Sequence, residues 1–451
     1  MNIIIVGCGR VGQTLAEKLN AEGNNVTVID NCAEKVKALA NKIDVMGVIG
    51  NGASHITQKE AGIDSADLLI AVTGADELNL LACIIAKQAV GCHTIARVRD
   101  HVYYMDAPYL KDELGLAMVI NPEQETAEEI ARVLRFPSAI SIETFAKGKV
   151  ELLKFRIPDG SPIAGMSVRD VVQKYKCDLL FCTAERGDEA YIVKGNFVFE
   201  ERDIISIIAS PKNAQGFFAE IGYKTHSVKD AIIVGGGEVC HYLCSILENS
   251  GIKLRVIEKD KAVAERLSSE FPGITVINAD TADQEILNEE GIGKAGAFIA
   301  LTDTDEENVI LSLFARGRGS AKVVTKIKRI DYDDVIQKLD LDTVVYPKNI
   351  TADKIVRYVR STDNRRGSDM ETLYNVIQDK IEAAEFKVAQ NSAVVGIPLS
   401  QLKLRENVLV SAILRDGKVI IPRGNDSILV GDSVVLVSEA SELCDISDII
   451  K

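Results

Sequence analysis

The chain contains an internal repeat, and this repeat restricts the possible folds more than any other feature. The segment NIIIVGCGRVG at 2–12 returns as DAIIVGGGEVC at 230–240, 228 positions later. Further on, AVTGADELN at 71–79 returns as ALTDTDEEN at 300–308, 229 positions later. Similarity that persists at a nearly constant offset is the signature of a tandem duplication. The chain is therefore expected to contain two copies of one fold.

Within each copy, short apolar strands alternate with amphipathic helical patterns. This alternation, with continuously apolar strands, predicts an α/β fold: a doubly wound, Rossmann-like parallel sheet covered by helices on both faces. One more helix is expected at about 122–135, because Asn121-Pro122 places proline at a helix start, and its counterpart begins at Tyr346-Pro347. In the first copy we expect strands at 2–6, 26–30, 45–49, 67–72 and 94–98, and helices at 10–22, 33–41, 55–61 and 76–90.

The segments that follow each α/β unit also match each other. Residues 139–157 alternate apolar and polar side chains around AKGK, which predicts a β-hairpin, and residues 370–388 repeat this pattern. KGNFVFEERD at 194–203 parallels RGNDSILVGD at 423–432. The expected organisation is two Rossmann-type domains, each followed by a small α+β domain, at 1–122, 138–222, 228–346 and 368–451.

Composition and charge narrow the classes of function. The formal charge is −14 and the sequence pI is near 5.1, which argues against nucleic-acid partners because phosphate binding needs a basic face. No apolar run approaches the roughly 20 residues that span a bilayer, and no signal peptide is expected at the N-terminus. The nine cysteines form no C-x-x-C pair, which favours reduced thiols in the cytosol over disulfides or a metal site.

The first glycine-rich loop has the complete context of a dinucleotide-binding motif. Gly7, Gly9 and Gly12 follow an apolar strand and precede an amphipathic helix, and Asp30 ends the second strand. Gly7 permits the tight turn, Gly9 lets the backbone approach a pyrophosphate, and Gly12 lets helix and strand pack closely. The helix start attracts the pyrophosphate, and the Asp30 carboxylate accepts hydrogen bonds from ribose hydroxyls and repels a 2′-phosphate. This pattern predicts binding of NAD(H) or another adenine nucleotide rather than NADP; the alternative is a tight turn that binds nothing.

The second copy retains only part of the motif. Gly235 and Gly237 are present, and Glu258 stands where Asp30 stands in the first copy. Cys240 replaces the third glycine and is expected to crowd the contact between helix and strand. Two interpretations stay open, namely a second nucleotide site and a structural or dimerising relic.

Several other residues follow strands at the carboxyl edge of each sheet, where ligands bind in such folds. Thr73 and Gly74 open the first T-x-x-D-E-x-N segment, and Thr302 opens the second. They are predicted to contact the ligand at this edge; the alternative is helix capping alone. Asn51 and Asp280 follow the third strands and are expected to border an adenine, or to be ordinary turn residues. Arg97 ends the fifth strand and is predicted to clamp a phosphate; a solvated surface charge is the alternative.

These motifs resemble a known family. The chain is similar to regulator-of-potassium-conductance (RCK) domains in six motifs. They are GCGRVG with Asp30, GNGASH at 50–55, AVTGADELN, ARVR at 96–99, NADTADQEIL at 278–287 and VVG…LKL at 394–404. The tandem arrangement resembles the TrkA family, the peripheral NAD-binding subunits of bacterial Trk potassium uptake systems. The resemblance covers essentially the whole chain, and Cys240 is its departure from the family's glycine loop. By position, it implies nucleotide contacts at Gly7, Cys8, Gly9, Arg10, Val11, Asp30, Thr73, Gly74 and Arg97, and in the second copy at Gly235, Gly236, Gly237, Glu238, Val239, Glu258 and Thr302.

The resemblance also implies partners and a location. It implies a homo-oligomeric ring, a tetramer, on the cytoplasmic face of the plasma membrane beneath a membrane-embedded Trk- or Ktr-type potassium-transporting subunit. NAD(H), with ATP or ADP as further candidates, would control potassium flux. The five histidines show no catalytic spacing with Asp or Lys, so we expect a regulator and no enzyme. The alternatives are an NAD-dependent oxidoreductase and a nucleotide-sensing regulator of another cation transporter.

Overall fold

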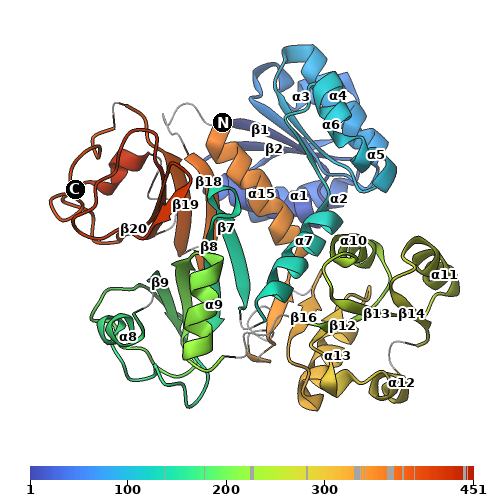
Figure 1. The fold of residues 1–451 in the computed structure, drawn as a ribbon. Coiled ribbons are helices and arrows are strands. Elements are labelled where there is room, and N and C mark those ends of the chain that lie inside the picture. Colours follow the sequence, from blue (N-terminus) through green and yellow to red (C-terminus); the bar gives the residue numbers. More distant parts are fainter. Residues whose placement is uncertain are drawn as a thin grey trace.

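The computed structural model describes most of the chain, and four sheets organise it (Figure 1). The expected domain limits Ser138 and Ser368 lie outside the described residues. The described residues are 1–137, 139–176, 178–223, 228–280, 283–329, 336, 338–339, 341–362, 370–377, 380–390, 392–439, 443 and 445–451.

The first sheet has six parallel strands in the order β3-β2-β1-β4-β5-β6, the strand order of a Rossmann fold. Its strands are apolar along their length because helices cover both faces. The strands are β1 (Asn2–Val6), β2 (Asn25–Asp30), β3 (Met46–Ile49), β4 (Leu68–Ala71), β5 (His93–Arg97) and β6 (Met118–Ile120). The helices are α1 (Arg10–Ala21), α2 (Ala33–Lys42), α3 (His55–Glu60), α4 (Asp76–Val90), α5 (His101–Met105) and α6 (Ala107–Leu114).

A second six-stranded parallel sheet repeats this topology in the order β14-β13-β12-β15-β16-β17. The predicted fold class is thereby confirmed for both copies. The strands are β12 (Asp230–Val234), β13 (Lys253–Glu258), β14 (Thr275–Asn278), β15 (Ala297–Ala300), β16 (Val323–Lys326) and β17 (Thr343–Val345). The helices around it are α10 (Glu238–Leu247), α11 (Lys261–Glu270), α12 (Gln284–Glu289) and α13 (Asp305–Arg318).

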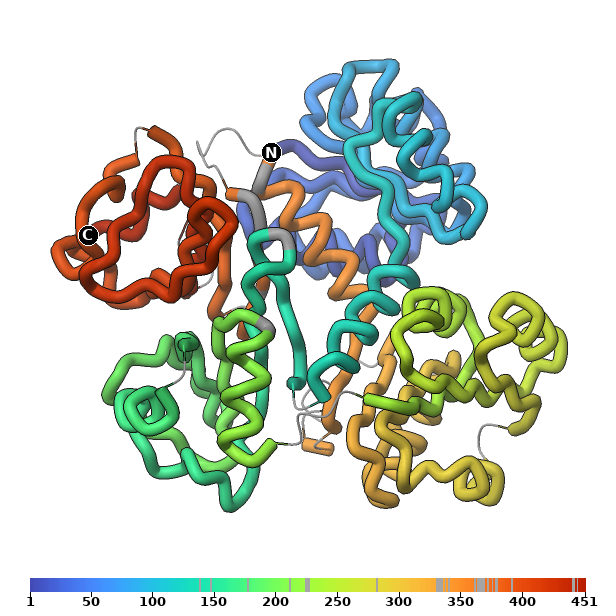
Figure 2. Tube along the Cα trace, in the orientation of Figure 1, coloured from blue at the N-terminus to red at the C-terminus, as the bar shows by residue number. Residues whose placement is uncertain are grey.

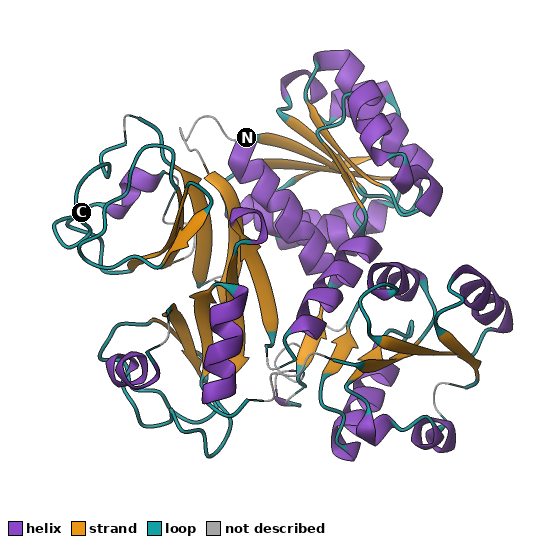
Figure 3. Ribbon diagram, in the orientation of Figure 1, coloured by secondary structure: helices purple, strands orange, loops and turns teal. Residues whose placement is uncertain are grey.

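Each Rossmann-type sheet is followed in the chain by a five-stranded antiparallel sheet (Figure 3). The orders β10-β9-β11-β8-β7 and β21-β20-β22-β19-β18 are equivalent, so the small domains are duplicated as well. The first comprises β7 (Ser141–Phe145), β8 (Val150–Arg156), α8 (Val168–Tyr175), β9 (Leu179–Arg186), β10 (Glu189–Ile192), β11 (Ile204–Ala209) and α9 (Pro211–Glu220). The second comprises β18 (Met370–Ile377), β19 (Ile381–Lys387), β20 (Val408–Arg415), β21 (Lys418–Ile420) and β22 (Ser433–Glu439).

Two long helices cross between the copies. Helix α7 (Pro122–Arg135) follows the first Rossmann-type sheet but packs on α10 of the second copy, through a shared core that contains Ile130 and Leu243. Helix α15 (Pro347–Thr362) follows the second sheet and packs on α1 of the first copy, through a core that contains Leu19 and Ile355. Figure 2 shows the exchange, with the orange α15 beside the blue first domain and the teal α7 beside the olive second domain. The exchange gives each copy a helix packed on the other.

The small domains pack against each other. Their sheets share an apolar core that contains Phe145 and Leu152 of the first domain and Ile381 and Val435 of the second. Glu385 Oε2 also accepts a hydrogen bond from the backbone N–H of Ala146 (3.1 Å). The copies are therefore in contact through the crossing helices and also through the small domains.

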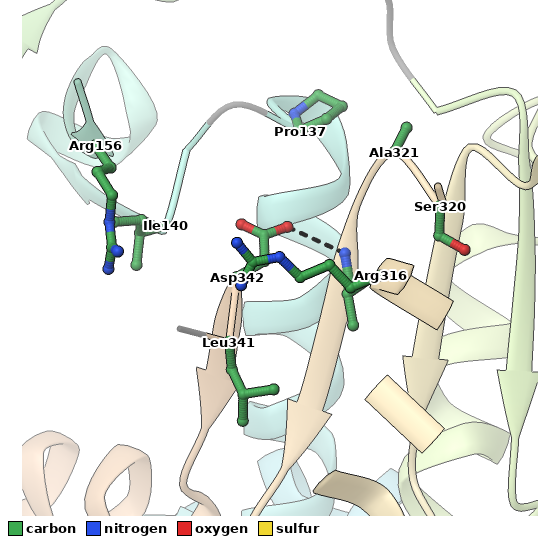
Figure 4. Close-up of a pocket in the computed structure, with 9 residues that line it drawn as sticks. Pro137, Ile140, Arg156, Arg316, Ser320, Ala321, Leu341 and Asp342 are labelled. Carbon is green, nitrogen blue, oxygen red and sulfur yellow. Dashed lines mark hydrogen bonds between the residues drawn. The ribbon is translucent and has the colours of Figure 1, made fainter. Parts of the chain in front are cut away.

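The first small domain is also fixed to the second Rossmann-type sheet. The ammonium of Lys322, whose side chain is fully buried, donates to Ala139 O (2.6 Å) and Asp342 Oδ1 (3.0 Å). A pocket of about 270 Å³ lies at this junction. Figure 4 shows Arg316 and Asp342 of the second Rossmann-type domain on one side of it and Arg156 of the first small domain on the other.

Candidate functional site

The first glycine loop connects β1 to α1 at the carboxyl edge of the sheet. Gly7 has φ +108°, a left-handed conformation that favours glycine, and a Cβ there would lie 3.0 Å from Thr73 N. A Cβ on Gly12 would lie 1.8 Å from Gly7 O, so only glycine lets α1 start this close to the strand. Gly9 is the N-cap of α1, and no side chain caps this end of the helix. The helix start therefore offers its unpaired N–H groups to an anion.

The carboxylate of Asp30 fixes this loop. Asp30 Oδ2 accepts a hydrogen bond from Cys8 N (2.7 Å), and Asp30 Oδ1 accepts one from Cys32 N (2.9 Å). The sequence predicted a contact with ribose and missed these two backbone bonds. An ionised carboxylate has about four acceptor positions, so the geometry leaves acceptor capacity for ribose hydroxyls.

The second copy repeats the same arrangement. Gly235 has φ +98°, and Glu258 accepts hydrogen bonds from Gly236 N (2.5 Å) and Asp260 N (2.7 Å). Cys240 is fully buried, and its Sγ lies 3.9 Å from Cys244 Sγ. Its hydrogen bond with Cys244 and its burial raise the pKa of the Cys240 thiol well above its ordinary value. The side chain that the sequence predicted to crowd the loop is accommodated in the core beneath α7.

The two loops differ in charge where an anion would lie. Arg10 is the first residue of α1, whereas Glu238 is the first residue of α10 and pairs with Arg266 (3.4 Å). Arg97 is partly buried, and burial lowers its pKa. Its counterpart Lys326 is almost fully buried and donates to Leu301 O (2.5 Å). The first copy therefore offers the more favourable electrostatics for a pyrophosphate.

The T-x-x-D-E-x-N segments act as clamps between strands. Asn79 Oδ1 accepts from Thr73 N (2.8 Å) and Thr73 Oγ1 (2.7 Å), while Asn79 Nδ2 donates to Arg97 O (2.9 Å). Asn308 makes the same bonds with Thr302 and with Lys326 O. The N-cap of α4 is Ala75, without a side-chain capping bond, so capping alone does not explain the motif. We predicted no role for Asn79 from the sequence. Its recurrence as Asn308 in the second copy was the signal that it has one.

The acids of the same motif hold the next loop. Asp76 Oδ2 accepts hydrogen bonds from Arg99 N and Asp100 N, both at 2.8 Å, and Arg99 donates in turn to Gly74 O (2.7 Å). In the second copy, Asp305 accepts from the backbone of 328 and 329 in the same way. Thr73, Gly74 and Arg97 are thereby brought together beside the first glycine loop.

The residues after the third strands lie further out. Asn51 is exposed, and its Oδ1 accepts from Ala53 N (3.0 Å) in a local turn. Asp280 is exposed after β14, at the limit of the described residues. Both remain predictions as nucleotide contacts.

Each glycine-loop helix contacts the other copy. The guanidinium of Arg10 at the start of α1 donates to Lys328 O (3.2 Å) in the second copy. The hydroxyl of Tyr242 in α10 donates to Arg99 O (3.3 Å) and accepts from Asn121 Nδ2 (2.9 Å) in the first copy. Both glycine-loop helices therefore take part in the contact between the copies.

The buried lysine of the second copy gives stability a defined pH dependence. Burial lowers the pKa of Lys326 to about 8, from 10.5. Between these values Lys326 binds more protons in the unfolded chain than in the folded chain, so its own contribution to stability rises as pH increases from about 8 to 10.5. Buried thiols such as Cys83 and Cys182, whose pKa burial raises, contribute with the opposite sign in this range. Lys326→Met is expected to raise the free energy of unfolding at neutral pH by about 1–3 kcal/mol, and its advantage over the unmodified chain is expected to shrink as pH rises from about 8 to 10.5. Urea denaturation across this pH range measures both effects.

Arg97→Met is the matched control for this experiment, because arginine stays protonated throughout the range. The control is expected to retain the pH dependence of the unmodified chain. If Lys326→Met retained it as well, another group would be responsible and the assignment would be wrong.

Two paired Rossmann-type sheets with glycine loops, each with a small α+β domain, define the class of tandem RCK-like proteins. Residues 3–122 and 231–347 match the TrkA-N domain family, and residues 152–222 and 383–451 match the TrkA-C domain family. The chain belongs to the TrkA family.

Curated relatives and solved structures agree with this assignment. The chain is 30% identical over 460 residues to Trk system potassium uptake protein TrkA homolog 1 of Methanosarcina mazei, with all of both chains covered. It is 30% identical over 442 residues to Trk system potassium uptake protein TrkA of Haemophilus influenzae, covering 97% of this chain and 95% of the relative. The structure "GsuK channel bound to NAD" shares the fold, with a TM-score of 0.63, 16% identity, and 97% of this chain and 77% of that chain covered.

Among the described residues, no helix is long and apolar enough to cross a membrane. The same part of the chain contains no group of three His, Cys, Asp or Glu residues that could hold a metal ion.

Proposed function

We propose that this chain is the nucleotide-binding regulatory subunit of a potassium uptake system. It would bind NAD(H), with ATP or ADP as competing adenine nucleotides, and control flux through a membrane-embedded potassium-transporting subunit of the Trk or Ktr type. The observation that carries the proposal is the first glycine loop, whose open helix start and acid-anchored backbone lie on the contact between the copies. The curated relatives named as Trk uptake proteins support it.

We assign the nucleotide contacts as follows. The N–H groups of the loop and helix start would hold the pyrophosphate, Asp30 would accept from the ribose, and Arg97 would neutralise phosphate charge. The full set proposed for the first copy is Gly7, Cys8, Gly9, Arg10, Val11, Gly12, Asp30, Asn51, Thr73, Gly74 and Arg97. In the second copy, the set Gly235, Gly236, Gly237, Glu238, Val239, Glu258, Asp280 and Thr302 is proposed as a weaker site, because Glu238 places a negative charge at the helix start.

The mechanism follows from the crossing helices. A nucleotide at one glycine loop changes the contact with the other copy, and α7 and α15 transmit this change to the small domains. Driving a gate from 1:99 to 99:1 requires about 5.5 kcal/mol of differential binding, or about 1.4 kcal/mol from each site in a ring of four chains. We propose such a homotetrameric ring, attached to the cytoplasmic face of the plasma membrane through its partner.

A regulator fits this chain better than an oxidoreductase. Hydride transfer needs an acid or base beside the nicotinamide, and the duplicated small domains supply an interface between copies instead. His101 and His241 lie at the contact between the copies, with ring centroids 5.5 Å apart, and His241 pairs with Glu270 (3.0 Å). These two histidines therefore belong to the interface between the copies, as expected of a regulator.

Potassium flux tests the proposal. The chain is combined with a Trk-type transporting subunit in vesicles, and flux is measured with NADH, ADP, ATP or no nucleotide. We expect NADH and at least one of the other nucleotides to change flux by different amounts, and the Asp30→Ala chain to lose the NADH response. Equal flux under all four conditions would refute the proposal.

A further inference from the structure

A second pocket, of about 540 Å³, lies between α7 and the C-terminal end of α10, away from both glycine loops. Its floor is apolar and includes Ala131, Leu134 and Leu247, which belong to the core beneath these helices. Ile246 also lines it and is 36% exposed. A volume of this size is typical of a small-molecule site.

The rim of the pocket is basic in a chain that is acidic overall. Arg132, Arg135 and Lys229 line it together with one acid, Glu128. Arg132 pairs with Glu129 (2.5 Å). Arg135 is 55% exposed, and its Nη2 lies 3.7 Å from Glu151 Oε1, beyond hydrogen-bond distance. A cation at the edge of an apolar floor is the arrangement that recognises an amphiphilic anion.

The duplication provides an internal comparison for this pocket. Helices α7 and α15 are equivalent at an offset of 225, and α1 and α10 at an offset of 228, so the α1–α15 contact is the counterpart of the α7–α10 contact. Arg360 corresponds to Arg135, and it is only 11% exposed. It donates to Glu22 Oε1 (2.6 Å) and makes two bonds to Glu382, at 2.8 and 3.0 Å.

Three side chains around the pocket differ from those at the equivalent positions of the other copy. Ser250 stands at the position of Glu22, so Arg135 loses the carboxylate that Arg360 has. Ile246 stands at the position of Lys18, which forms an ion pair with Asp353 across the α1–α15 contact. Ile252 similarly replaces Asn24. The polar side chains Lys18, Glu22 and Asn24, of which the first two form ion pairs with α15, are thus replaced by two isoleucines and a serine in the other copy.

The geometry points to a binding site for an amphiphilic carboxylate in the α7–α10 pocket. Its carboxylate takes the place of the Glu22 carboxylate and pairs with Arg135, and Lys229 adds a second positive charge at the rim. Its apolar body covers Ile246, Leu247 and Ile252. A ligand seated there holds α7, from the first copy, against α10, from the second.

Decanoate is the probe, with decanol and decyltrimethylammonium as uncharged and oppositely charged analogues, in calorimetric titrations of the full chain. We expect decanoate to bind one site per chain, and both analogues to bind at least about tenfold more weakly, the affinity equivalent of one charge-assisted hydrogen bond. Equal binding of all three probes, or no binding of decanoate, would overturn the proposal.

The double variant Ile246→Lys, Ser250→Glu rebuilds in α10 the side chains that α1 carries at the equivalent positions. It is expected to fold, to keep its NADH affinity, and to bind decanoate at least about tenfold more weakly. Ser245→Glu, which adds the negative charge of the Ser250→Glu change alone at an exposed position of α10 outside the pocket lining, is expected to retain decanoate binding. Unchanged decanoate binding in the double variant contradicts the site. A change in its oligomeric state, measured by sedimentation, contradicts it too, because this face would then be an interface between chains.

Discussion

Replacing Arg360 by leucine is expected to lower the free energy of unfolding by about 3–5 kcal/mol, because the change removes the cation that bridges two largely buried carboxylates. The side chains of Glu22 and Glu382 are only 12% and 10% exposed, and Arg360 bridges them. Arg360 also joins three units, since Glu22 lies after α1, Arg360 in α15 and Glu382 in β19. Urea denaturation followed by circular dichroism measures the loss.

Arg135→Leu is the matched control, at the equivalent position in α7. Its guanidinium is half exposed and lies 3.7 Å from the buried carboxylate of Glu151, beyond hydrogen-bond distance, so its removal is expected to cost clearly less than that of Arg360, which makes three hydrogen bonds to carboxylates. Similar losses for both variants would mean that the burial of the Arg360 cluster has little energetic consequence. Adding Glu22→Gln and Glu382→Gln to Arg360→Leu is expected to restore part of the lost stability.

Replacing Asp30 by alanine is expected to weaken NADH binding by about 100-fold. The carboxylate holds the backbone of the loop at Cys8 and Cys32, and it is the proposed acceptor for the ribose. One charge-assisted bond contributes about 1.5–3 kcal/mol, and about 2.8 kcal/mol corresponds to about 100-fold in affinity. Asp30→Asn keeps one acceptor oxygen and is expected to lose less. Calorimetric titration with NADH measures both variants.

Asp67→Ala is the control for this loss. Asp67 also accepts a hydrogen bond from a backbone N–H of the same sheet, that of Asn2 (2.7 Å), but at the opposite edge from the glycine loop. Its replacement is expected to leave the NADH affinity unchanged. An unaltered affinity in Asp30→Ala would place the nucleotide elsewhere.

The fold class followed from the sequence because its determinants are local. Apolar runs such as 2–6 and 26–30 predict strands, and the glycine loop with Asp30 predicts the first strand–helix–strand unit. The observed β1 at Asn2–Val6 and α1 at Arg10–Ala21 agree with those expectations to within a residue. The internal repeat then extended each assignment to the second copy.

The crossing of α7 and α15 did not follow from the sequence. The apolar faces of these helices, with Ile130 in one and Ile355 in the other, predict that each is buried but not against which copy. Both copies offer similar surfaces because they arose by duplication. Which copy each helix packs against depends on contacts between residues far apart in the sequence, such as Asn121 with Tyr242.

Some site residues could be predicted from the sequence and others could not, and the reason is physical. Gly7 and Gly12 have a backbone requirement that is visible in the spacing of the motif, and the structure places them as the motif requires. The clamp formed by Asn79 and the loop support by Asp76 depend on side chains reaching across neighbouring strands. No local sequence pattern predicts such contacts. The recurrence of the same residue types in both copies does, however, indicate that these positions matter.

We infer above all that the first glycine loop binds a nucleotide and that the chain does not turn it over. Titration of the full chain with NADH, NAD⁺, ATP and ADP, with nicotinamide absorbance recorded in parallel, tests it most directly. We predict NADH binding in the micromolar range, constant nicotinamide absorbance, and a strongly reduced binding heat in Asp30→Ala. Absence of binding by all four nucleotides, or consumption of NADH, would contradict the claim.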